Sequence, residues 1–91
     1  MDTRVAVILI IVEQEDAIEE LNAMLHEARQ YIVGRMGIPY RPKGISIISI
    51  AIDAPQNTIS ALSGKIGRLK GVSAKTAYSN VITPAEEGAE Q

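Results

Sequence analysis

The sequence predicts a single α+β domain whose elements follow one another in the order βαββαβ. The chain has 91 residues, of which 46% are hydrophobic, so it has room for one modest core and is too apolar to stay disordered. Residues 4–13 and 45–53 are apolar on both alternating faces, as buried strands are. Two further segments repeat apolar residues every three or four positions, which is typical of helices that bury one side.

The first strand and helix are expected at residues 4–13 and 16–30. The apolar residues on one face of this strand are Val5, Val7, Leu9 and Ile11. Asp16 lies at the N-cap position with Glu19 three residues later, in the pattern of a capping box. The buried helix stripe would consist of Ile18, Leu21, Leu25 and Ala28. Asn22, His26 and Arg29 would lie on the opposite face.

The second half of the chain predicts an edge strand, a buried strand, a helix and a last strand. Gly34 and Gly37 interrupt residues 31–38, which indicates an edge strand with a bulge. The next strand is expected at residues 45–53. A helix would begin at Pro55 and end at Gly71, with its stripe formed by Ile59, Leu62, Ile66 and Leu69. The last strand is expected at residues 72–80.

This order of elements predicts how the sheet is covered. With right-handed crossovers it gives a ferredoxin-like fold, a four-stranded antiparallel sheet with both helices on one face. The first and third strands are then central. Helices on one face leave roughly 400–600 Å² of apolar sheet bare on the other, which is large for a monomer. We therefore expect a homo-oligomer, either a dimer or a tetramer.

Charge and hydropathy restrict the partners and the location. Residues 1–80 are expected to form the domain, and residues 81–91 an acidic, flexible tail. Because the net charge is −2, we do not expect direct binding to nucleic acid. The apolar run at residues 5–12 is too short to cross a bilayer, which needs about 20 residues. The sequence thus predicts a cytoplasmic protein without a membrane partner.

Eight of the nine Lys and Arg residues lie between Arg29 and Lys75, which favours an anionic ligand. Arg35, Arg41 and Lys65 are the candidates for contacting it. Gly34 and Gly37 have two readings, a ligand rim that needs close backbone approach or a bulged edge strand that avoids aggregation. The predicted ligand-binding set is Gly34, Arg35, Gly37, Arg41, Ser63, Gly64 and Lys65.

Small residues on the second helix lie away from its buried stripe. Ser63-Gly64-Lys65 hints at a phosphate loop, but the full pattern is missing and the segment lies inside a helix. Gly64 and Gly67 are expected to serve a ligand or a chain interface. The alternatives are a helix that ends early and neutral sequence drift. The predicted interface set is Ser60, Gly64, Gly67, Ile45 and Ile47.

Catalytic residues, metal ligands and cofactors are not expected. The chain has one histidine and no cysteine, whereas a closed metal site needs three or four ligands. The favoured reading of His26 is a solvent-facing helix residue. The alternative is a metal site shared between chains, in which His26 would act with Glu27 or Glu19.

Several segments resemble the iron-only hydrogenase system regulators. They are residues 31–40, 44–48 and 59–65, within a similarity that covers residues 4–79. Leu69-Lys70-Gly71-Val72 is similar to the end of an ACT-type domain. The resemblance implies an ACT-like domain with a regulatory role near hydrogenase genes.

A more distant resemblance is to the nickel-sensing domain of the nickel-responsive repressor. His26 falls on one of its nickel ligands, but the other three ligand positions fall on Gly37, Pro39 and Ile45, which cannot bind metal. The nickel site is therefore not expected here. The repressor's DNA-binding domain would precede the first strand and has no counterpart in this sequence.

Together these observations predict a homo-oligomeric regulatory module that senses a small ligand or docks a regulatory protein. It would influence transcription through a partner, because no DNA-binding domain of its own is expected. The alternatives are a regulator that binds DNA directly and a small enzyme with a site shared between chains.

Overall fold

The computed structural model describes residues 2–83, and in this range the elements follow the predicted βαββαβ order. The strands are β1 (Thr3–Val12), β2 (Ile32–Tyr40), β3 (Ile45–Ala54) and β4 (Val72–Thr83). The helices are α1 (Ala17–Glu27) and α2 (Gln56–Gly67), and short 3₁₀ turns occupy Arg29–Tyr31 and Arg41–Lys43. The predicted α+β, ferredoxin-like fold is confirmed.

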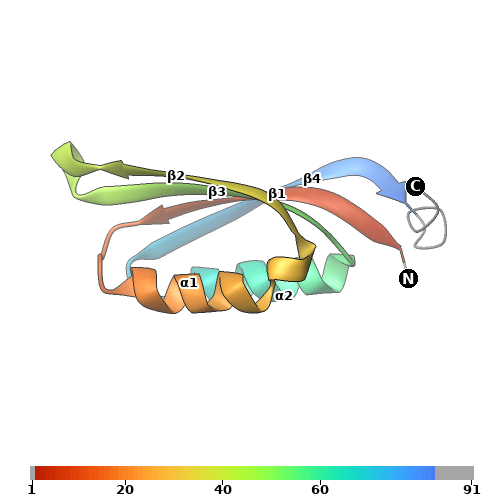
Figure 1. Cartoon of the computed structure of the whole chain (residues 1–91), viewed down its shortest axis with the longest axis horizontal. Coiled ribbons are helices and arrows are strands. Elements are labelled where there is room, and N and C mark those ends of the chain that lie inside the picture. Colours follow the sequence, from red (N-terminus) through yellow and green to blue (C-terminus); the bar gives the residue numbers. More distant parts are fainter. Residues whose placement is uncertain (1, 84–91) are drawn as a thin grey trace.

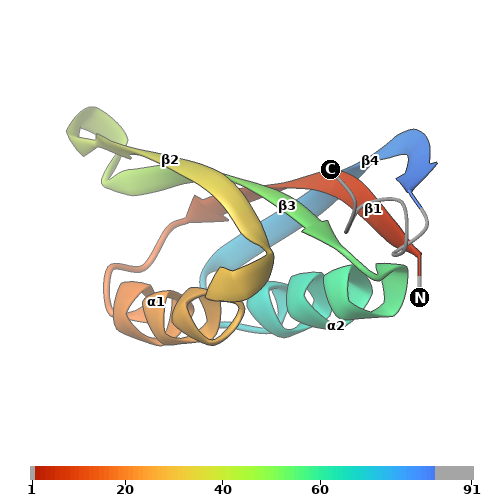
Figure 2. The same ribbon diagram turned by 45° about the vertical axis from the view of Figure 1, so that its right-hand side comes forward.

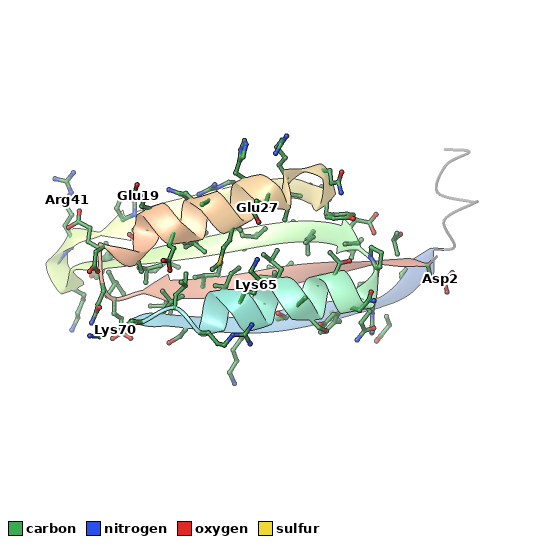
Figure 3. All side chains as sticks on the ribbon, turned by 90° about the horizontal axis from the view of Figure 1, so that it is seen from below. Asp2, Glu19, Glu27, Arg41, Lys65 and Lys70 are labelled. Atoms are coloured by element: carbon green, nitrogen blue, oxygen red, sulfur yellow. The ribbon has the colours of Figure 1, made fainter. Side chains whose placement is uncertain are left out.

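The described strands form one antiparallel sheet in the order β2-β3-β1-β4. β1 and β3 are central, as their apolar faces predicted. Figure 1 shows both helices on the same side of the sheet, and of the described elements none lies over the other side. Figure 3 shows this helix layer from below, with α1 beneath the β2–β3 side of the sheet and α2 beneath β1 and β4.

The core lies between the sheet and the helices. Alternate residues of the two central strands fill it from above: Ala6, Ile8, Ile10, Val12, Ile48, Ile50, Ile52 and Ala54. The predicted helix stripes fill it from below, chiefly through Leu21, Leu25, Ile59, Leu62 and Ile66. Ile18, Ala28 and Leu69 are partly buried against this core. Within the described residues no polar side chain is buried, so burial of apolar surface is the main source of stability.

The start of α1 differs from the capping box that the sequence predicted. Asp16 occupies the N-cap position but makes no capping hydrogen bond with its side chain in the described part of the chain. Its φ of −68° and ψ of −13° are already helical, whereas a side-chain cap requires an extended backbone. Backbone carbonyls serve instead, because Ala17 N–H donates to the Gln14 carbonyl and Ile18 N–H to that of Glu15.

Other element ends also differ from the prediction. α1 ends at Glu27 and α2 at Gly67, earlier than expected, while β2 continues through Pro39 to Tyr40. The predicted bulge in β2 is confirmed as a register shift between Ile32 and Gly34. β2 is the predicted edge strand, which is where a proline is tolerated.

β4 is longer than predicted and includes residues 81–83, which the sequence predicts as part of the acidic tail. Its register with β1 shifts between Ala6 and Arg4. Arg4 holds the shifted segment, because its Nε donates to the Ser79 carbonyl at 2.6 Å and its guanidinium lies 4.9 Å from the centre of the Tyr78 ring. Residues 84–91 of the predicted tail lie outside the described range.

Two glycines occupy left-handed backbone positions that close turns. Gly71 has φ = 76° and accepts the Glu13 N–H at 2.7 Å, which ties the α2–β4 connection to the end of β1. A Cβ on Gly71 would lie 2.8 Å from the Cβ of Gln14. Gly44 has φ = 65°, but a Cβ there would meet no heavy atom of the described chain within 4 Å.

We expect Gly71→Ala to destabilise the protein more than Gly44→Ala does. Both changes carry the left-handed backbone cost of about 1–2 kcal/mol, and only Gly71→Ala adds a clash, of roughly 1–3 kcal/mol. Urea denaturation of both variants measures the difference. Equal losses would mean that the loop at Gln14 moves aside without cost, and would contradict the prediction.

Candidate functional site

The side of the sheet that faces away from the helices is here called the open face (Figure 2). Apolar side chains lie along its centre. Its large apolar side chains are between 40% and 62% exposed. They are Val5, Leu9, Ile11, Met36, Ile38, Tyr40 and Ile47. Isolated exposed apolar residues are common, but seven on one face of one sheet form a patch that indicates an interaction surface.

The strand register makes this patch continuous. Ile38 pairs with Ile47, and Ile47 pairs with Ile11, so three isoleucines form one row across β2, β3 and β1. Met36, Ser49 and Leu9 form the next row. Directly opposed side chains on one face lie within contact distance. The described open face carries two charged residues beside these apolar side chains. Lys75 on β4 is paired with Leu9 and so continues the second row, and Asp53 on β3 is paired with Val5.

β2 is the most exposed part of the described sheet, since every residue from Val33 to Tyr40 is exposed. Neither glycine of this strand is in close contact in the described chain. A Cβ on Gly34 would meet nothing within 4 Å, and one on Gly37 only the Ile48 Cγ1 at 4.0 Å. The bulge next to Gly34 agrees with the edge-strand reading, and the ligand-rim reading stays a prediction.

The structure does not bring the three predicted ligand-binding cations into one site. Arg35 lies on the helix side of β2, where its Nη2 donates to the Asn22 Oδ1 at 3.2 Å. Arg41 lines a pocket of about 330 Å³ at the end of the β2–β3 hairpin. Lys65 lines a groove of about 370 Å³ between α1 and α2, together with Glu27. Figure 3 shows Arg41 at one end of the molecule and Lys65 in the middle of the helix layer.

The small residues of α2 lie on its β4 side. Thr76 Oγ1 donates to Ser63 Oγ at 2.8 Å, and the hydroxyls of Ser60 and Tyr78 are 3.3 Å apart. These contacts attach α2 to β4 and account for the two serines. A Cβ on Gly64 would meet only the tip of Arg68, at 3.4 Å, and one on Gly67 would meet no described atom within 4 Å.

The predicted interface residues therefore lie on two different sides of the sheet. Ile45 and Ile47 belong to the open face, whereas Ser60, Gly64 and Gly67 belong to the helix layer. The predicted interface set does not contain Met36, Ile38 and Tyr40, which also lie on the open face. The signal that could have found them is the alternation of apolar residues at positions 36, 38 and 40, which the glycines and Pro39 obscured.

Among residues 2–83 no group of three His, Asp or Glu side chains lies close enough to hold a metal ion. His26 is exposed on the outer face of α1. None of the described helices is both long enough and apolar enough to cross a membrane.

An antiparallel β2-β3-β1-β4 sheet with two helices on one face defines the chain as a ferredoxin-like α+β domain. The chain belongs to the TM1266-like family, because the model of that family matches residues 4–76. The family is described, provisionally, as an iron-only hydrogenase system regulator. The resemblance to these regulators noted from the sequence is confirmed.

One solved structure agrees with this family assignment, and a second shares only the fold. The structure of the uncharacterized protein TM1266 from Thermotoga maritima matches this chain with a TM-score of 0.80 and 35% sequence identity. The match covers 84% of this chain and 96% of TM1266. A formyltetrahydrofolate deformylase from Pseudomonas putida has a TM-score of 0.62 at 13% identity, over 85% of this chain and 29% of that enzyme, which shows a shared fold alone. No curated protein matches the chain.

We expect Gly64→Ala to stabilise the folded subunit by about 0.5–1 kcal/mol, because alanine favours a helix interior more than glycine does. The added Cβ would meet only the end of the flexible Arg68 side chain. The reverse change at an exposed position of the same helix, Ala61→Gly, is the matched control and should destabilise by a similar amount. Urea denaturation reports both. A less stable Gly64→Ala variant would contradict this reading of α2.

Proposed function

We propose that this protein is a regulatory module of the iron-only hydrogenase system that works as a homo-oligomer. In this proposal two copies associate through the open face, and the assembly responds to a small anionic ligand or docks a regulatory protein that acts on transcription. The family assignment supports the regulatory role. The observation that carries the assembly is the continuous apolar surface on the uncovered side of the sheet.

The size of the open face supports a second copy as its occupant. Seven large side chains about half exposed correspond to roughly 600 Å² per chain, at the upper end of the largest patches found on monomers. Two such faces packed together would bury on the order of 1,200 Å², which is the lower limit for specific, stable interfaces. A chain of 91 residues also gains from such burial, because small domains hide only about 60–70% of their surface alone.

The chemistry of the open face also favours a self-complementary contact. Its central rows hold Ile38, Ile47 and Ile11, and beside them Met36 and Leu9. In a twofold contact the same patch meets itself. The isoleucine row brings no charged group to such a contact, whereas Lys75 lies at the β4 end of the Leu9 row. Two sheets stacked face to face at about 10 Å would interdigitate these side chains as in a β-sandwich.

The proposed assembly predicts that a charge at the centre of the open face separates the copies. We expect the wild-type protein to sediment as a dimer or tetramer and Ile47→Lys to sediment as a lone subunit, because an unpaired buried ammonium group is strongly unfavourable. Ala23→Lys, on the exposed side of α1, adds the same group elsewhere and should leave the assembly intact.

Met36→Lys is a second variant of the open face and should also separate the copies. The Met36 side chain is 62% exposed and therefore lies outside the folding core. Circular dichroism checks that each variant is folded, and native mass spectrometry counts the subunits. A wild-type protein that stays a lone subunit at micromolar concentration would refute the proposed assembly.

We further expect the pure protein not to shift duplex DNA in a gel at low salt. The net charge is −2, and Arg35, Arg41 and Lys65 line three separate pockets instead of one basic strip. DNA affinity depends on the neutralisation of consecutive phosphates. A salt-sensitive shift by the pure protein would favour the alternative, a regulator that binds DNA directly.

A further inference from the structure

A pocket of about 300 Å³ lies between the outer side of α1 and β2. The described residues that line it are Asn22, Leu25, His26, Arg29, Ile32 and Arg35. Leu25 and Ile32 supply an apolar floor, and the other four supply polar groups. None of these six residues is acidic, although the chain as a whole has more acidic than basic residues.

The fold brings these polar groups together from two elements. Asn22, His26 and Arg29 are spaced by four and three residues, so they form one stripe along α1 and the turn that follows it. Arg35 reaches the same stripe from β2, where it pairs with the core residue Ile50 and therefore lies on the helix side of the sheet. The helix dipole commonly favours a cation at the end of a helix, as at Arg29. It does not explain Arg35, which lies on β2.

Both guanidinium groups are oriented but not neutralised. The Arg29 Nη1 donates to the His26 carbonyl at 2.9 Å, and the Arg35 Nη2 donates to the Asn22 Oδ1 at 3.2 Å. A guanidinium has five N–H donors, so each arginine retains most of its donors for another acceptor. Neither side chain is paired with a carboxylate among residues 2–83.

We propose that this pocket, here called the Arg29–Arg35 pocket, binds a small molecule through one phosphate group. Two guanidinium groups without a carboxylate match the charge of a phosphate monoester, which is about −1.5 to −2 near neutral pH. Their forked donors also match its oxygens. The volume of about 300 Å³ lies at the lower end for ligand pockets, which suits a small phosphorylated compound.

The inference rests on the proposed ligand-responsive function and specifies its ligand. Because the Arg29–Arg35 pocket lies in the helix layer, it would stay accessible when two open faces are in contact. Assembly and phosphate binding can therefore be tested separately. An assembled protein that binds no phosphate would refute the inference alone, and a lone subunit that binds phosphate would refute the proposed assembly alone.

The test is an NMR titration of the ¹⁵N-labelled full chain with inorganic phosphate, glycerol 3-phosphate and succinate at constant ionic strength. We expect both phosphates to cause saturable shifts confined to amides of residues 22–35. Arg29→Gln and Arg35→Gln should each raise the phosphate Kd about tenfold or more, as the loss of a charge-assisted hydrogen bond does. Asn22→Ala, which releases Arg35, should also raise the Kd.

Arg68→Gln is the matched control, because it removes the same charge from an exposed position that does not line the pocket. Its Kd should equal that of the wild type. Three results would overturn the inference: no saturable shift with either phosphate, an equal loss of affinity in Arg68→Gln, or tighter binding of succinate than of phosphate at the same amides. The amide spectrum outside residues 22–35 shows whether each variant is folded.

Discussion

The structure depends on one mismatch between the sheet and the helices. β1 and β3 carry apolar side chains on both faces, and the described helices cover only one of them. The covered side has the properties of a protein interior, since Ile8, Ile50 and Ile52 are completely buried. The open face consists of equally apolar residues in the same two strands, such as Leu9 and Ile47. Burial of apolar surface is the dominant favourable term in both folding and association, so the same sequence pattern that determines the fold also favours assembly.

Much of the fold could be predicted because this pattern is strong. Strands with two apolar faces had to be central, and the helix stripes at Leu21 and Leu25 and at Ile59, Leu62 and Ile66 had to face them. What the sequence could not predict depends on local backbone geometry. The Asp16 side chain does not cap α1, since the backbone is already helical at that residue. β2 runs through Pro39 because an edge strand does not need that N–H.

The candidate site was predictable only in part, because its residues come from segments that are distant in sequence. The basic segment between Arg29 and Lys75 suggested one anion site, but the fold distributes Arg35, Arg41 and Lys65 over three pockets. Strand alternation decides which side of the sheet Arg35 occupies, and the β2 bulge shifts that alternation by one residue. The bulge could be expected from the glycines, but its position could not. The contact between Arg35 and Asn22 therefore required the structure.

β2 is the element in which the two proposed activities meet. Its alternate residues lie on opposite sides of the sheet, so Arg35 lines the pocket beside α1 while the adjacent Met36 belongs to the open face. A ligand that fixed Arg35 against α1 would also fix the strand that carries Met36, Ile38 and Tyr40. Since β2 is bonded to the sheet along one edge only and is exposed over most of its length, it is the strand whose position such a ligand would alter most. Ligand binding and assembly would then be coupled only to the extent that the ligand binds the assembled and separate subunits with different affinity.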